Sequence, residues 1–292
     1  MNGKYKGIIY IILAAVGFAF MNLFVKLAGD VPAVEKAFFR NFVAMFFAFF
    51  MMKKKKLSFV APKESRKYIF LRSLGGSIGI FANFYSIGKL CISDASMLNK
   101  LSPFWAILFS IFLIKEKPKW YQTLCVCVAF IGALFILKPG VDMMTSFPAF
   151  IGLIGGACAG FAYTNVRLAS QHGAPGPLII FCFSAFTCIV SIPLMAPVFV
   201  PLSKFQLFSL FMAGVSATVG QVFITAAYSL APAAEISVYD YTQIIFAAIL
   251  GAIFLGEYPD IYSVIGYFII IGAGITMFLY NRKHHRILGE KS

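Results

Sequence analysis

Charged residues are scarce in this sequence of 292 residues, and their scarcity excludes an ordinary soluble protein. Only 12% of the residues are charged and 60% are hydrophobic, whereas soluble domains carry about 25% charged residues. Water-soluble packing cannot hide so much apolar surface, so most of the chain must face lipid or other lipid-embedded helices. Among the charged residues the acidic ones are the fewer, with 11 Asp and Glu against 25 Lys and Arg. In a soluble protein this excess would suggest nucleic acid, but here the basic residues lie beside apolar runs, and we expect no nucleic-acid partner.

The sequence also lacks the motifs of catalysis and of nucleotide or metal binding. It contains no HExxH, no GxSxG and no glycine-rich phosphate-binding loop. Its six cysteines form no CxxC pair, and five of them lie inside apolar runs, where packing is their simplest role. We therefore expect no enzyme activity, no cofactor and no metal site. Without a Walker motif, any transport has to draw on a gradient rather than on bound ATP.

Ten apolar runs make up nearly the whole chain, and each is long enough to cross a bilayer as a helix. They cover about 7–28, 33–52, 67–90, 94–115, 119–138, 148–170, 176–199, 205–230, 233–255 and 260–281. The runs lack the alternation of barrel strands and are too long for them. The first run is too long for a signal-peptide core, so we expect it to remain in the protein. The predicted fold is an all-α membrane protein with ten transmembrane helices.

The basic residues predict how these helices are oriented in the membrane. With the N-terminus in the cytoplasm, most of the Lys and Arg residues fall on the cytoplasmic side, including the block at 53–56 and the tail at 282–292. We therefore expect a multi-pass protein of the cytoplasmic (inner) membrane, with both termini in the cytoplasm and the lipid bilayer as its surroundings.

Two halves of the sequence resemble each other at a constant offset. DASMLNKLSPFWAILFSIFLIKEKP in the first half matches AEISVYDYTQIIFAAILGAIFLGEYP in the second. Aligning Glu116 with Glu257 also places Asn99 on Asp240. Because each unit contains five helices, an odd number, the second unit must cross the membrane in the opposite direction. We predict two inverted five-helix repeats, at 1–140 and 147–281, followed by a basic tail at 282–292.

Charged side chains inside the predicted spans are the first candidates for a functional site, because charge is costly in lipid. Arg40, Lys100 and Asp240 each lie about seven residues into a span, or roughly 10 Å deep. We expect Arg40 and Lys100 to make the outer half of a cavity positive and Asp240 to place a negative charge on its inner side. Asp240 could alternatively carry a coupling proton, and a buried structural pair is the competing interpretation. Arg72 also enters a span, from which it could reach back to the surface.

Uncharged polar and aromatic side chains complete the candidate site. Most lie on spans one, three, four, six, eight and nine, so we expect these six helices to line a polar cavity while the other four face lipid. The candidate substrate-binding residues are Asn22, Arg40, Arg72, Tyr85, Asn99, Lys100, Trp105, Tyr163, Gln221, Tyr228, Tyr239, Asp240, Tyr241 and Gln243.

Prolines, turn carboxylates and glycines predict the local shape of the helices. Pro103 should kink the fourth span, and because its repeat mate is Ile244, we expect the kink in one repeat only. Glu116 and Glu257 each precede a proline placed to begin the next helix, and we expect them to stabilise those helix starts. Glycines spaced four apart in the third and sixth spans predict close helix contacts.

These residues together resemble the drug/metabolite transporter superfamily, and within it the ten-helix EamA type. The likeness covers nearly the whole chain and is carried by AFFR at 37–40, SDASMLNKLSPFWAILFSIFLIKEKP at 93–118, FIGALFILKPG at 130–140 and AAEISVYDYTQIIFAAILGAIFLGEYPD at 233–260. The surroundings of Arg40 and Arg72 are also similar to a subgroup that includes S-adenosylmethionine carriers. The resemblance implies a secondary carrier that works by alternating access, with its path between spans one to four and six to nine.

The predicted function is therefore a permease or exporter for a small polar metabolite, such as an amino acid, an amine or a nucleoside-type compound. Its expected partners are the substrate and either a coupling proton or a counter-substrate. The alternatives are a non-transporting membrane enzyme, a flippase or a partner subunit of a membrane complex.

Overall fold

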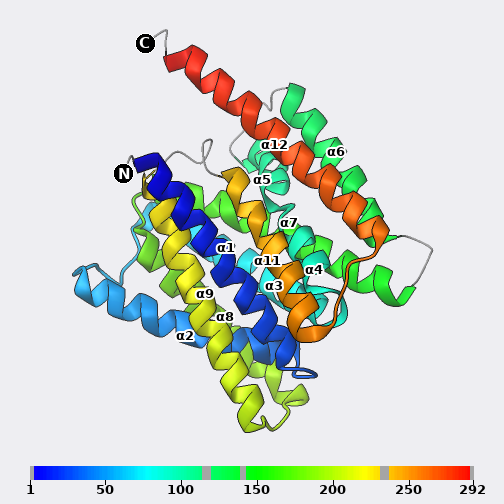
Figure 1. The fold of residues 1–292 in the computed structure, drawn as a ribbon. Helices are drawn as coiled ribbons and strands as arrows, with labels where there is room; N and C mark the ends of the chain where they lie inside the picture. Colours follow the sequence, from blue (N-terminus) through cyan, green and yellow to red (C-terminus); the bar gives the residue numbers. More distant parts are fainter. Residues whose placement is uncertain (1–2, 114–119, 139–142, 231–236, 290–292) are drawn as a thin grey trace.

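The fold is described by a computed structural model that covers residues 3–113, 120–138, 143–230 and 237–289, and these residues contain no strand. Long helices fill the molecule, some running side by side and others lying across them (Figure 1). They are α1 (Gly3–Leu27), α2 (Ala33–Lys54), α3 (Arg66–Lys89), α4 (Ile92–Asn99), α5 (Ser102–Leu113), α6 (Trp120–Leu137), α7 (Met143–Gln171), α8 (Gly176–Met195), α9 (Lys204–Leu230), α11 (Thr242–Leu255) and α12 (Ile261–Gly289), with 3-10 turns η1 (Lys63–Ser65), η2 (Ala196–Val198) and η3 (Ser237–Tyr241).

The expected ten-span, all-helical membrane fold is confirmed. Among the described residues, seven segments are long and apolar enough to cross a membrane, with α4 and α5 forming one of them. The other three expected spans are α2, α3 and the segment 239–255. In α2 the charges of Glu35, Lys36 and Arg40 lie near the helix start, whereas α3 is rich in Ser and Gly. The segment 239–255 is apolar but shorter than the other spans.

Helices of the first repeat pack on helices of the second. The sequence offset between the repeats maps each packed pair onto an equivalent pair or onto itself. α1 packs on α9, and α3 packs on α7. These two contacts are equivalent, because α7 is the repeat mate of α1 and α9 is the repeat mate of α3. α2 packs on its own mate α8, and α6 packs on its own mate α12. A two-fold relation between two inverted repeats produces this pattern.

Small residues let these equivalent helix pairs approach closely. A Cβ atom on Gly17 of α1 would lie 2.8 Å from the backbone nitrogen of Gly220 of α9. A Cβ atom on Gly79 of α3 would lie 3.3 Å from the Cβ of Cys158 of α7. Gly220 is the repeat mate of Gly79, and Cys158 is the mate of Gly17. The same small-residue crossing therefore occurs once in each equivalent pair, and the predicted close glycine contacts are confirmed.

The fourth and ninth spans are both interrupted, at equivalent positions. α4 ends at Asn99, and α5 begins only at Ser102. In the second repeat, η3 ends at Tyr241, where α11 takes over. Because Tyr241 is the repeat mate of Lys100, the two interruptions coincide. The two repeats still differ, as expected from Pro103 and its mate Ile244: α4 and α5 are separated in the first repeat, whereas in the second repeat the 3-10 turn leads directly into α11.

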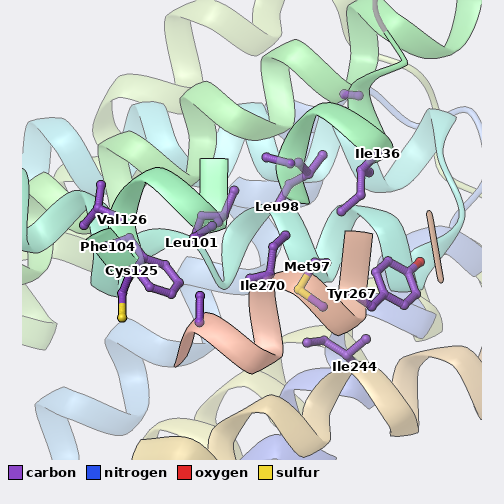
Figure 2. Close-up of a cluster of buried hydrophobic side chains, with 14 of the residues drawn as sticks. Met97, Leu98, Leu101, Phe104, Cys125, Val126, Ile136, Ile244, Tyr267 and Ile270 are labelled. Atoms are coloured by element: carbon purple, nitrogen blue, oxygen red, sulfur yellow. The ribbon is translucent and has the colours of Figure 1, made fainter. Parts of the chain in front are cut away.

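A buried hydrophobic cluster joins the two repeats behind these interruptions (Figure 2). Leu98, Leu101 and Phe104 of the fourth span meet Ile244 of α11 and Ile270 of α12. All five side chains are almost fully buried. α6 and α12 complete the cluster, and a Cβ atom on Gly132 of α6 would lie 2.8 Å from the side chain of Ile270. The fifth and tenth spans therefore hold the interrupted spans in place.

Candidate substrate-binding site

An ion pair joins the two interrupted spans across the interface between the repeats. The Lys100 ammonium lies 2.5 Å from Oδ2 of Asp240. Both side chains are largely buried, with 12% and 18% of their surface exposed. Lys100 follows the last turn of α4, and Asp240 lies in η3, so each residue is carried by the interrupted part of its span. Oδ1 of Asp240 is buried without a hydrogen-bond partner, which leaves one acceptor of the pair unused.

This pairing corrects the expected distribution of charge. Lys100 and Asp240 were expected to charge opposite halves of a cavity, but they neutralise each other across the repeat interface. Arg40 does not join them. It lies instead with Arg72, and both guanidinium groups sit over the ring of Phe183 of α8, at 5.8 and 4.2 Å from its centre. The candidate residues therefore form two separate charged groups, one paired and one with two like charges.

The two arginines and Phe183 lie inside the helix bundle. Arg72 reaches along α3 to Gly76, where an added Cβ atom would lie 2.0 Å from the arginine Nη1. The side chain thus points away from the start of α3, so the alternative in which it reaches back to the surface is wrong. The candidate Tyr163 of α7 is exposed. Spans two and seven were expected to face lipid, yet they supply Arg40 and Phe183 to this interior group.

The remaining candidates are spread over several environments. Asn22 is buried and donates to the hydroxyl of Ser96, at 2.9 Å. Trp105 packs on Phe130, and its indole nitrogen is buried without a partner. Asn99 and Gln221 are half-buried, Gln243 is buried, and Tyr239 is exposed. Tyr85 contacts Phe147 with part of its ring exposed, Tyr241 packs against Gly274, and the side chain of Tyr228 lies outside the described residues.

A second group of contacts, not expected from the sequence, joins the two repeats at one face of the molecule. Gly256 adopts the left-handed conformation that ends α11, with a φ of 64°, and places Glu257 at the end of α1. There Glu257 binds Lys26 at 2.7 Å and accepts the backbone N–H of Ile92 at 3.1 Å. Lys26 also donates to the carbonyl of Leu90. We call Lys26, Leu90, Ile92 and Glu257 the latch, because they tie the second repeat to the first.

The latch shows that Glu257 does not stabilise the start of the helix that follows it. It supports the start of α4 in the other repeat, whereas Asp260 accepts the backbone N–H of Ser263 at the start of α12. The equivalent Glu116 lies outside the described residues. One sequence signal for this arrangement was available, since Lys26 and Glu257 carry opposite charges at the ends of two spans.

Two further contacts lie beside the latch. Lys138, at the end of α6, forms an ion pair with Asp260. Partial burial raises the pKa of the Asp260 carboxyl, but hydrogen bonds from Lys138 and Ser263 outweigh it and hold the pKa below its usual range. Tyr267 of α12 donates to the buried carboxyl of Asp94 at 2.5 Å. Asp94 was not among the candidates, because the sequence places it at the boundary of a span, where helix-start carboxylates are common.

Comparisons with known proteins agree with this architecture. The sequence profile of the EamA-like transporter family matches residues 5–138 and 146–280. The pseudopaline exporter CntI of Pseudomonas aeruginosa is 31% identical over 275 residues, which cover 93% of this chain and 95% of the exporter. The S-adenosylmethionine uptake transporter of Rickettsia prowazekii is 28% identical, with 83% and 84% of the two chains covered. A solved crystal structure shares the fold at a TM-score of 0.60 and 16% identity, covering 94% of this chain and 97% of that one.

Proposed function

This chain belongs to the EamA-like transporter family, and we propose that it is a secondary transporter that moves a small polar metabolite by alternating access. The relatives named for pseudopaline export and S-adenosylmethionine uptake support a small-molecule cargo. We propose an amino acid, an amine or a nucleoside-type compound. The proposal retains repeat boundaries at 1–140 and 147–281, close to the two matched segments. It also retains a place in the inner membrane, with both termini in the cytoplasm.

The observation that carries the proposal is the ion pair between Lys100 and Asp240 at two coincident helix interruptions. Charged groups inside membrane spans are costly and are usually retained for function. Transporters with inverted repeats bind their cargo near the membrane midplane, at the repeat interface, where helices are discontinuous. The ion pair lies at the repeat interface, beside the break between α4 and α5, which supports this role, and the unpaired Oδ1 of Asp240 offers an acceptor to a polar cargo.

The latch supports alternating access. Lys26 and Glu257 join the repeats at the face where α1 ends and α12 begins. With the N-terminus in the cytoplasm, this face is the outer one. The proposed cycle breaks the latch to open that face, while the inverted repeat closes the opposite face through the equivalent helix contacts.

The test locks the latch and measures which side can reach the interruption. Cys91 donates to the backbone carbonyl of Tyr258 at an S–O distance of 3.7 Å, so Tyr258→Cys places a second thiol beside it. The other native cysteines are replaced, and Asn99→Cys serves as the reporter in sealed proteoliposomes of known orientation. Before oxidation, impermeant maleimide should reach the reporter from both sides. After cross-linking of the latch, it should reach the reporter only from the side opposite the latch.

The control replaces Cys91 with Ser, so that oxidation cannot lock the latch and labelling from both sides should persist. A reducing agent should restore two-sided labelling in the locked protein. A membrane enzyme or a partner subunit would show one fixed pattern before and after oxidation. Such a fixed pattern in the unlocked protein would contradict the proposal.

A further inference from the structure

We propose that Arg40 and Arg72 form an anion site that receives a carboxylate of the transported compound. The inference rests on the proposed function, because it names the chemical class of the cargo for the same carrier. Its starting point is the meeting of two guanidinium groups from α2 and α3 over one aromatic ring, that of Phe183 in α8. Like charges repel, so their meeting inside a helix bundle needs a compensating group.

The described part of the protein supplies no carboxylate to either arginine. Its ion pairs involve Lys26, Lys100 and Lys138. The Nε atoms of both arginines are buried and have no hydrogen-bond partner. A buried donor that has lost water without gaining a partner destabilises the folded state. An oxyanion that enters from outside the chain would supply both the missing charge and the missing acceptors.

The site is already shaped before a ligand arrives. Gly76 leaves the space that the Arg72 guanidinium occupies, since any larger residue would place a Cβ atom in it. Asn41 donates to the carbonyl of Ala37, which fixes its amide, and its Oδ1 accepts one N–H of Arg40 at 2.8 Å. On the other side, the hydroxyls of Ser77 and Thr187 bind each other at 2.7 Å, joining α3 to α8 one turn from Phe183. Preorganised donors lose less entropy on binding.

The depth of the site favours cargo over lipid as the source of the anion. Arg40 lies seven residues into α2 and Arg72 six residues into α3, which places both roughly 10 Å from the helix ends at about 1.5 Å per residue. Lipid phosphates lie at the helix ends, where Arg66 is exposed at the start of α3. A planar carboxylate matches the guanidinium fork. The ring of Phe183 would contact the rest of the compound.

The test measures equilibrium binding by thermal unfolding of the purified full-length protein in detergent at constant ionic strength. The probes are succinate, its uncharged analogue succinamide, and glycerol 3-phosphate as a soluble lipid headgroup. Ligands that bind only the folded state raise its melting temperature. We expect succinate to raise it and succinamide to leave it unchanged. Arg40→Gln and Arg72→Gln should each weaken the apparent affinity for succinate about tenfold or more, whereas the exposed Arg66→Gln should not change it.

The melting temperatures of the variants without ligand distinguish a binding role of the two arginines from a purely structural one. We expect Arg72→Gln to keep or raise the melting temperature without ligand, because it removes a buried like charge. A lower melting temperature together with an unchanged response to succinate would assign Arg72 to packing and overturn the proposal. Stabilisation by glycerol 3-phosphate alone, or no stabilisation by succinate, would also overturn it. This test measures binding without transport. Its failure would therefore not change the result expected from the two-sided labelling test of the proposed function.

Discussion

Single residues in this protein show two ways of holding charge inside a membrane. Lys100 and Asp240 cancel each other at 2.5 Å, across the repeat interface. Arg40 and Arg72 stand together over Phe183 with no carboxylate from the described residues. In the first arrangement each charge has its partner within the protein, and in the second, by our proposal, the partner is a bound anion.

Replacing one residue of the central ion pair should destabilise the protein more than replacing both. Lys100→Met or Asp240→Asn alone leaves an uncompensated buried group and should destabilise the fold by about 3–5 kcal/mol. The double variant should recover much of this loss, because neither charge remains. Unfolding in denaturant of the two single variants and the double variant measures the coupling. Additive losses in the double variant would show that the two side chains do not depend on each other.

The lowered pKa of Asp260 predicts that the stability of the protein depends on pH only in acid. Because its pKa in the folded state is lowered, its contact with Lys138 stabilises the protein above the ordinary pKa of 3.8 and is lost as the pH falls through the lowered value. The carboxylate side chain is about half exposed, so the contribution is less than about 1 kcal/mol.

Melting temperatures from pH 3 to pH 8 for the natural protein and Asp260→Asn provide the measurement. Their difference should stay constant above about pH 5 and shrink towards zero in stronger acid. A difference that grows in acid would contradict the assigned direction of the pKa.

The sequence predicts which charges lie at membrane depth, but it does not predict their partners. Arg40, Lys100 and Asp240 are recognisable because each interrupts an apolar run. The contact between Lys100 and Asp240 joins residues 140 positions apart, and it depends on how two helices cross. The position of Arg72 depends on the space left by Gly76, a property of packing that no periodicity expresses.

At the scale of helices, α7 is the element on which the first interrupted span rests. A Cβ atom on Gly156 would lie 2.5 Å from the carbonyl oxygen of Leu98, and one on Gly160 would lie 2.6 Å from the Cβ of Trp105. Both distances are shorter than van der Waals contact. These glycines therefore let α7 touch the end of α4 and the start of α5. The glycine spacing predicted this contact, and Pro103 lies in the first turn of α5, at the predicted break in the fourth span.

Gly156→Ala should destabilise the protein, because the new methyl group meets backbone rather than a flexible side chain. Overpacking of this kind costs about 1–3 kcal/mol. The matched control is Gly272→Ala in α12, where nothing lies within 4 Å of an added Cβ atom. That control should be neutral or stabilising by up to about 1 kcal/mol through helix propensity. Equal effects of the two substitutions on the melting temperature would contradict close packing at Gly156.

At the scale of the whole molecule, two inverted repeats place the latch on one face. α1 meets α9 and α3 meets α7 in equivalent ways, so the opposite face is built from the same helix contacts with the roles of the repeats exchanged. The sequence predicts this symmetry from one constant offset. It does not predict which face carries the latch, because that depends on contacts such as the one between Glu257 and Ile92.

Weakening the latch should expose the central interruption to the latch side. Glu257→Gln removes the charge that binds Lys26, and we expect labelling of an Asn99→Cys reporter from that side to become about tenfold faster, since hydrogen bonds between charged groups contribute about 1.5–3 kcal/mol. Glu64→Gln, which alters an exposed carboxylate in η1, is the control and should not change the rate. Unchanged labelling in Glu257→Gln would exclude the latch as a closing element.

The central ion pair also makes the duplicated chain unequal. Lys100 and Asp240 are charged, while their repeat mates Tyr241 and Asn99 are neutral. A carrier assembled from two identical copies would rest equally in its two orientations. In this chain one of the two corresponding contacts is ionic and the other is not, so exchanging the roles of the repeats changes the energy. In the proposed cycle, the divergence of the two repeats at these four positions gives the empty protein a preferred resting side.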